Sequence, residues 1–292
     1  MRALSRRTWL ASLVAALFIR PERLDSSSGP TAQRRRYRAD AVITFLGIPI
    51  YSRQDVGGGY AVLEEARVDD ARRLSLEFAG GSRPERARGL NRLGFIRETV
   101  LERGGALAEA RYFGFMTSSP EEDLDEARKA LAAQNGSLFY SAVDGLAAKG
   151  RMISAKARLL FPASYSFTRH RELLGEVQKA FPQSRQAPVE TEAGAGTFLY
   201  ALSRAMADHS PRFVCDYAWN GKIYQLKTEK HREADGRWRL KGRVAERGRK
   251  AGPGFRLWYQ DAPGPVLPTR IELDARSFLK LSFVEVGQEA AA

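Results

Sequence analysis

The sequence predicts an α+β protein: a curved antiparallel β-sheet, or unclosed β-barrel, with about three helices packed on or beside its concave face. Two consecutive hairpins between residues 212 and 244 alternate apolar and polar side chains, as strands with one buried face do. About ten further alternating runs, separated by Gly and Pro turns, extend this pattern along the chain. The chain has 292 residues, of which 43% are hydrophobic. We expect one β-rich domain at residues 33–292, preceded by an export signal and linker at residues 1–32.

The first hairpin has a defined register. Its first strand places four apolar side chains on one face, namely Phe213, Cys215, Tyr217 and Trp219. Asn220-Gly221 follows, and this dipeptide accepts the positive φ angles that a two-residue type I′ turn requires. The turn pairs Tyr217 with Tyr224, and Cys215 with Leu226, so the apolar faces of the two strands coincide.

The second hairpin has two possible loops. A two-residue turn at Asp235-Gly236 would place the basic side chains of the next strand on the apolar face, because a slip of one residue inverts a strand. A three-residue loop with Gly236 in the left-handed region instead sets Val244 opposite Leu226 and Trp238 near Arg232. We predict the three-residue loop.

The N-terminus has the layout of an export signal. Three arginines precede the apolar run of residues 10–19. Residues 5–10 (Ser-Arg-Arg-Thr-Trp-Leu) are similar to the twin-arginine motif, whose pathway exports folded proteins. Cleavage within residues 26–32 and retention as an uncleaved anchor both remain open. We expect a periplasmic or secreted protein.

The charge predicts anionic partners. The formal net charge is +13, and residues 33–292 keep +10 because residues 1–32 hold five arginines and two acids. For an exported protein, the nearest anions are phospholipid headgroups or cell-wall polymers rather than nucleic acid. A general bias toward arginine is an equally good explanation. We expect a monomer.

The first half of the chain predicts a meander. Order is expected to begin near Tyr37, after a linker at residues 24–36 that includes Arg34-Arg35-Arg36. A buried strand at 41–46 is expected to bend at Gly47, and Gly57-Gly58-Gly59 is expected to form a turn. Further strands are expected at residues 60–68, 74–78, 95–102, 107–116, 137–143 and 152–161. The last two are separated by a turn at Asp144-Gly145.

Three segments with helical periodicity interrupt the strands. The first begins at Ser119, an N-cap residue that is followed by Pro120 in the first turn and by Glu122, which can complete a capping box with Ser119. The second spans residues 168–181, and the third spans residues 197–208 with an apolar stripe suited to lying across a sheet. Residues 182–196 are expected to form a loop that serves as a mobile cover. Strands at 255–260, 269–274 and 278–285 complete about twelve.

An arginine-rich loop is expected at residues 80–92. It holds four arginines and one acid, Glu85. The anion-binding candidates are Arg83, Arg86, Arg88 and Arg92. Arginine forks bind phosphate and carboxylate in a bidentate manner, and glycines allow backbone N–H groups to approach an anion. The alternative is a solvated loop between two strands.

Little in the sequence indicates catalysis. His170, His209 and His231 lack a second ligand at metal spacing, so we predict no metal site, and we predict no cofactor and no catalytic residue. Cys215 is expected to be a buried, unreactive thiol. Carboxylate pairs such as Glu64/Glu65 or Asp69/Asp70 leave a hydrolase as a third possibility.

The apolar face of the hairpins is the main candidate for function. The ligand-binding candidates are Tyr217, Trp219, Tyr224 and Leu226. They would either line a cavity for an apolar or lipid-like ligand or pack against the third helix as core. The second case favours a structural or interaction protein of the cell envelope. On the other face, Arg237, Arg239, Lys241 and Arg243 form a basic row that is either solvated, a guard against edge pairing, or a contact with an anionic bilayer.

Four segments in the second half resemble a known type of protein. They are Gly196–Leu202, the hairpin at Asn220–Tyr224, Phe255–Tyr259 and Leu267–Glu272. Together they resemble the C-terminal half of an uncharacterised family of secreted bacterial β-rich domains, which is similar to the periplasmic lipoprotein-carrier superfamily of the LolA/LolB type. The resemblance implies an unclosed barrel with helices in its concave face. It covers about a third of the chain and transfers no ligand residue.

Overall fold

The computed structural model describes residues 31–45, 48–117, 136–184, 187–192, 196–248, 252, 254–262, 265–276 and 279–287. The predicted helix at Ser119 lies outside these residues. So does the predicted export signal and linker at residues 1–32, except for its last two residues, which begin β1. The strands are β1 (Thr31–Phe45), β2 (Ile48–Val68), β3 (Ala71–Ser82), β4 (Leu93–Arg103), β5 (Ala106–Thr117), β6 (Ser137–Ala148), β7 (Arg151–Pro162), β8 (Ala187–Glu192), β9 (Arg212–Trp219), β10 (Lys222–Arg232), β11 (Trp238–Glu246), β12 (Gly254–Tyr259), β13 (Arg270–Arg276) and β14 (Leu279–Val286). Two α-helices occur in the described residues, α3 (His170–Ala180) and α4 (Phe198–Ala207).

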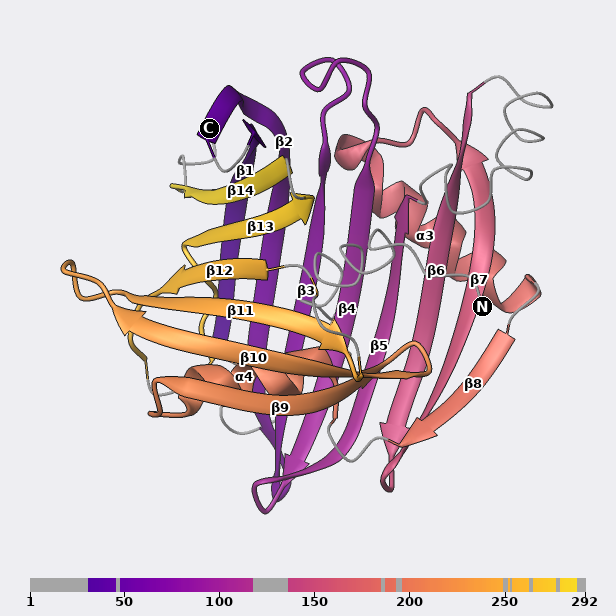
Figure 1. Ribbon diagram of the computed structural model, residues 1–292. Helices are drawn as coiled ribbons and strands as arrows, with labels where there is room; N and C mark the ends of the chain where they lie inside the picture. The colour runs from indigo at the N-terminus through magenta and orange to yellow at the C-terminus, as the bar shows by residue number, and fades with distance from the viewer. Residues whose placement is uncertain are drawn as a thin grey trace.

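All fourteen strands form one open antiparallel sheet. Their order is β8-β7-β6-β5-β4-β3-β2-β1-β14-β13-β12-β11-β10-β9, so β8 and β9 are the two edges. The sheet folds over, and the strands β9–β11 cross in front of the long strands β2–β5 (Figure 1). The predicted curved, unclosed antiparallel sheet is confirmed, with fourteen strands rather than about twelve.

The two helices lie on opposite faces of the sheet. The sheet has two halves, β1–β8 and β9–β14. The buried side of α4 joins a core that contains inner-face residues of both halves, such as Leu76 of β3 and Leu240 of β11. Leu173 and Val177 of α3 belong to a second core with Phe95 and Phe115, on the outer face of β3–β7. The expectation that all helices lie on or beside the concave face is therefore wrong for α3.

The predicted register of both hairpins is confirmed. Tyr217 pairs with Tyr224 and Cys215 with Leu226. Val244 lies opposite Leu226, and Trp238 lies opposite Arg232. Gly236 has a φ of 83°, as the three-residue loop requires. These positions follow from alternation and turn chemistry together.

Two predicted glycine turns are strand interiors instead. Gly57–Gly59 lie within β2, where a Cβ on Gly58 would be 3.0 Å from the Phe167 ring that packs on the sheet. Asp144-Gly145 lies within β6, and the actual turn is at Lys149-Gly150. A Cβ on Gly145 would lie 2.2 Å from Cζ of Tyr112. In both places glycine makes room for an aromatic ring rather than reversing the chain.

Three predicted connections also differ. Arg34-Arg35-Arg36 belong to β1 and pair with β2, so the linker does not extend to residue 36. The chain reverses after Phe45, which pairs with Ile48, instead of continuing as one bent strand. Residues 187–192 of the expected loop form edge strand β8 on β7. Backbone pairing across the sheet stabilises these segments, which local composition does not reveal.

Candidate ligand cavity on the concave face

Helix α4 fills the concave side of the sheet and is held at both ends by ionisable side chains. Glu98 of β4 accepts a hydrogen bond from the N–H of Leu199 at 3.1 Å. Lys230 of β10 donates to the carbonyl of Met206 at 3.3 Å and to that of Asp208. The ammonium of Lys230 at the C-terminus complements the helix dipole, and the buried carboxyl of Glu98 supplies a hydrogen-bond acceptor at the N-terminus. Because β4 and β10 belong to different halves of the sheet, α4 links the two halves.

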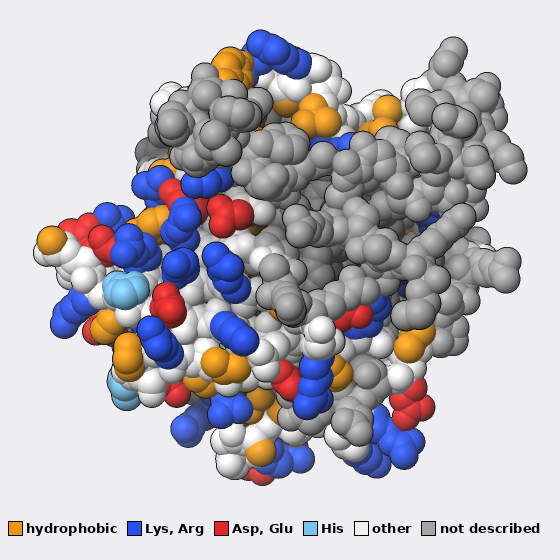
Figure 2. Space-filling view, in the orientation of Figure 1, with side chains coloured by type: hydrophobic (Ala, Val, Ile, Leu, Met, Phe, Trp, Pro, Cys, Tyr) orange, Lys and Arg blue, Asp and Glu red, His pale blue; other side chains and the backbone are white. Residues whose placement is uncertain are grey.

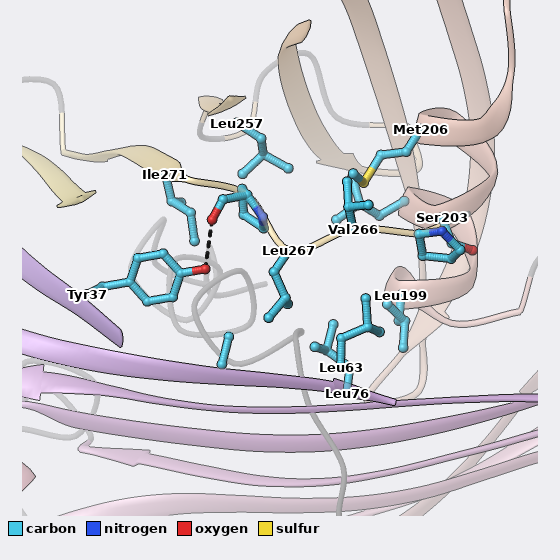
Figure 3. Close-up of a pocket in the computed structure, with 14 residues that line it drawn as sticks. Tyr37, Leu63, Leu76, Leu199, Ser203, Met206, Leu257, Val266, Leu267 and Ile271 are labelled. Carbon is cyan, nitrogen blue, oxygen red and sulfur yellow. Dashed lines mark hydrogen bonds between the residues drawn. The ribbon is translucent and has the colours of Figure 1, made fainter. Parts of the chain in front are cut away.

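A small apolar cavity remains beside α4. It has a volume of about 30 Å³, which is room for about one water molecule. Its walls come from the inner faces of β1–β3, from α4, from β12 and β13, and from the segment that joins these two strands (Figure 3). The lining residues are Tyr37, Ala61, Leu63, Leu76, Leu199, Leu202, Ser203, Met206, Leu257, Pro265, Val266, Leu267, Pro268 and Ile271.

The two hydroxyl groups in this lining are already bonded to backbone. Tyr37 donates to the carbonyl of Pro268 at 2.8 Å, which is the dashed line in Figure 3. Ser203 donates to the carbonyl of Tyr200 at 2.9 Å. Burial raises the pKa of Tyr37 well above its ordinary value, so this hydroxyl remains a donor. The cavity therefore offers an apolar surface and no free polar group among its lining residues.

Residues 265–268, which we call the plug, close the cavity between β12 and β13. Leu267 is 2% exposed and points between the inner strands and α4. The side-chain amide of Gln33 donates to the carbonyl of Pro265 at 3.2 Å and accepts from the N–H of Leu267 at 3.0 Å. With the bond from Tyr37, three side-chain hydrogen bonds from β1 hold the plug in place.

The sequence pattern did not predict the plug or the β1–β3 wall. Pro265-Val266-Leu267-Pro268 has the composition of a turn between two strands, and its prolines were the reason for that assignment. Two adjacent large apolar residues inside a turn are the signal that was available. Side chains of this kind normally require a buried site.

The four predicted ligand-binding residues lie elsewhere in the same core. Tyr217, Trp219, Tyr224 and Leu226 are 0 to 7% exposed, and none of them lines the cavity. The ring of Trp219 stacks on Tyr112 of β5 with centroids 4.1 Å apart. Tyr217 packs against Phe198 of α4 at 5.3 Å. They form a packed contact between the halves of the sheet, and a role in ligand binding stays a prediction.

The four predicted anion-binding arginines lie in or beside the connection between β3 and β4, at the top of Figure 1. Arg83 and Arg86 both form ion pairs with Asp55 of β2, the first at 3.0 Å. Arg88 is exposed and lies over the ring of Tyr51 at 5.6 Å. The N–H of Arg92 donates to the hydroxyl of Ser82 at 2.7 Å. Asp55 lies outside the loop in sequence, and it neutralises part of the loop's charge. An anion-binding role stays a prediction.

The candidate catalytic groups do not converge in the described residues. Glu64 and Glu65 are successive strand residues and point to opposite faces of β2. Asp70 forms an ion pair with Arg103, both largely exposed. No group of three His, Cys, Asp or Glu residues suited to a metal ion occurs in the described part of the chain. Within that part, no helix is long and apolar enough to span a membrane.

Cys215 lies half-buried on the inner side of β9. Burial raises the pKa of its thiol to about 11, with a smaller lowering effect from Arg204. Because the thiolate is the reactive form, this shift disfavours reaction at neutral pH.

Comparison with known proteins gives only distant resemblances. No family model matches the sequence, and no curated protein matches it. One solved structure, a β-barrel-like protein of the domain of unknown function DUF1849 from Brucella abortus, aligns over 87% of this chain and 95% of its own, with 8% identity and a TM-score of 0.47. Aeromonas veronii immune modulator A aligns over 94% and 98%, with 8% identity and a TM-score of 0.19. At these values neither resemblance carries a functional inference.

Proposed function

We propose that this protein is an exported, non-enzymatic binder of an apolar, lipid-like ligand, and that the ligand enters at the cavity beside α4. The observation that carries the proposal is the apolar wall of this cavity, whose two hydroxyl groups are both bonded to backbone, together with its closure by a short plug that three side-chain hydrogen bonds among the described residues fasten to β1. An alkyl chain recognises such a wall by burial of apolar surface alone.

The plug limits what can enter. A cavity of about 30 Å³ does not accommodate an alkyl chain. Val266 and Leu267 would have to leave their positions, and the space of these two side chains would then become available. Outward movement of the plug breaks three hydrogen bonds to β1, each contributing about 1 kcal/mol net. The release of the plug is therefore the step that we expect to control binding.

The resemblance to periplasmic lipoprotein carriers and the basic, then apolar, N-terminus are in keeping with this proposal. The N-terminus supports export, and the resemblance supports a lipid-like ligand. The second candidate is a structural or interaction protein of the cell envelope. The close packing of Trp219 on Tyr112 and of Tyr217 on Phe198 favours it, because the concave face is largely filled.

The test combines mass spectrometry of lipids that co-purify with the exported protein and titration with a fluorescent fatty acid. Leu267→Ala should bind the fatty acid about tenfold or more tightly than the parent, because it removes the side chain that competes for the site. The matched control is Leu273→Ala in β13, which is 4% exposed in the same core but does not line the cavity. Each change should lower the free energy of unfolding by about 2–5 kcal/mol.

Two outcomes would contradict the proposal. One is the absence of fatty-acid binding by both the parent and Leu267→Ala, which would leave the interaction protein as the better candidate. The other is an equal gain of binding in Leu267→Ala and Leu273→Ala, because this would show general loosening of the core rather than opening of the plug.

A further inference from the structure

The outer face of β10 and β11 carries three cations without an ion pair among the described residues: Lys227, Lys241 and Arg243, which we call the cation triad. All three side chains are exposed. Lys227 and Arg243 are directly opposite each other in the pairing of β10 with β11. Lys241 lies two residues from Arg243 and therefore on the same face. Figure 2 shows Lys and Arg side chains gathered over this front layer of strands.

The acids that neighbour Lys241 form ion pairs with other arginines rather than with the triad. Lys241 lies opposite Arg256 of β12, whose guanidinium is 2.6 Å from Glu272. On its other side Lys241 faces Glu229, which is 3.7 Å from Arg212 in an ion pair. The nearby acids are thus already paired with other arginines.

Like charges at directly opposed positions destabilise a sheet. Both the Lys227/Arg243 pair and the Lys241/Arg256 pair have this arrangement. A solvated surface gains nothing from it, whereas an anionic partner would relieve the repulsion. The arrangement therefore indicates a surface that meets negative charge.

An exposed apolar side chain indicates which anionic partner fits. Val214 of β9 is 56% exposed and lies directly opposite Lys227, on the outer face. A row of Val214, Lys227 and Arg243 thus combines an apolar group with two cations on an open strand face. This combination suits the boundary between headgroups and acyl chains, where cations contact phosphate and apolar side chains insert. A polyanion in solution offers no apolar region in which the valine side chain could be buried.

We propose that the outer face of β9–β11, through Lys227, Lys241, Arg243 and Val214, docks on an anionic phospholipid bilayer. This surface is separate from the cavity lining, so the proposal holds whether or not the cavity takes a ligand. Binding is expected to weaken as salt is added, because the Debye length falls from about 30 Å at 0.01 M to about 8 Å at physiological ionic strength.

The experiment is flotation with vesicles of phosphatidylcholine alone or mixed with phosphatidylglycerol, at low ionic strength. The test variant is Lys227→Gln/Lys241→Gln/Arg243→Gln. The matched control, Arg67→Gln/Lys149→Gln/Lys179→Gln, removes three exposed cations from the β2 end, the β6–β7 turn and α3. The test variant should bind the mixed vesicles on the order of a hundredfold more weakly than the parent, while the control binds within about threefold of it.

A second variant tests the apolar contact. Val214→Asn should weaken binding to the mixed vesicles severalfold without changing the net charge. Equal binding by the triad variant and the parent would overturn the proposal, as would equal losses in the triad variant and the control, since only net charge would then matter. Loss of binding to soluble polyphosphate with unchanged vesicle binding would also overturn it and assign the face to a polyanion in solution.

Discussion

At the scale of single residues, Glu98 makes the free energy of unfolding depend on pH. Its side chain is 0% exposed, and burial raises the pKa of its carboxyl to about 8, although the side chain of Thr197 and the N–H of Leu199 lower it in part. A carboxyl in an unfolded chain titrates near 4.5. Between these two values the folded state binds the proton and the unfolded state does not. Stability from this group is therefore complete below about pH 4.5, falls as the pH rises to about 8, and is constant above it.

The change that tests this coupling is Glu98→Gln, which keeps an acceptor for the N–H of Leu199 and cannot ionise. We expect the free energy of unfolding of the parent to fall by a few kcal/mol between about pH 5 and about pH 9, and that of the variant to fall much less. Urea denaturation at the two pH values measures both. Glu109→Gln, at an exposed position of β5, should keep the slope of the parent. A variant of Glu98 with the parent's slope would show that this carboxyl is ionised in the folded protein.

At the same scale, the sequence predicted which side chains of β9 and β10 are buried but not what they contact. Alternation places Trp219 on the inner face, and the turn at Asn220-Gly221 sets its register. Its actual neighbour, Tyr112, comes from β5, and the Tyr112 hydroxyl accepts a hydrogen bond from the N–H of Asn220 at 3.0 Å. Local patterns carry no information about a partner 107 residues away, so the sequence left both a cavity and a packed core open.

At the scale of elements, β6 depends on a glycine that local rules assign to a turn. The ring of Tyr112 lies over Gly145, and its hydroxyl is 2.7 Å from that of Ser154 in β7. On its other side the ring stacks on Trp219. Glycine is frequent both in turns and where a side chain approaches the backbone closely, and only tertiary contacts distinguish the two cases. The same ambiguity explains why the turn predicted at Gly57–Gly59 is wrong.

Gly145→Ala tests this contact. The new methyl group would overlap the Tyr112 ring, which is held on both sides, so we expect the free energy of unfolding to fall by about 1–3 kcal/mol. Gly175→Ala in α3 is the matched control. Apart from its chain neighbours and the backbone of the helix itself, nothing lies within 4 Å of a Cβ at that position, and alanine should stabilise the helix by up to about 1 kcal/mol. Thermal denaturation of both variants should show shifts of opposite sign. A neutral Gly145→Ala would mean that Tyr112 has room to move.

At the scale of the whole molecule, the sheet folds over without closing. Val189 of edge strand β8 lies against Gly221 at the tip of the β9–β10 hairpin, since a Cβ there would be 2.5 Å from the valine Cγ1. No strand pairing joins β8 to β9 in the described residues. The N–H of Ala218 in β9 donates instead to the carbonyl of Gly196 at 2.9 Å. The hairpins predicted an antiparallel sheet, and the resemblance to an unclosed barrel implied that it stays open. Neither predicted this crossing of the halves, which depends on side chains of α4, β5 and β9 that are distant in the chain.

Hydrogen exchange measured by mass spectrometry can establish whether the sheet stays open in solution. β1 pairs along its length with β2 and β14, whereas β8 has a partner on one side only. Amides without a partner exchange through small local openings, and those in paired central strands require larger ones. We therefore expect peptides from β8, and from the first half of β9, to exchange about tenfold or more faster than peptides from β1. The second half of β9 should be slower than the first, because the segment before α4 covers Ala218. Protection of β8 and β9 equal to that of β1 would mean that the two edges pair and the barrel closes, and the plug at residues 265–268 would then be the remaining entrance to the concave face.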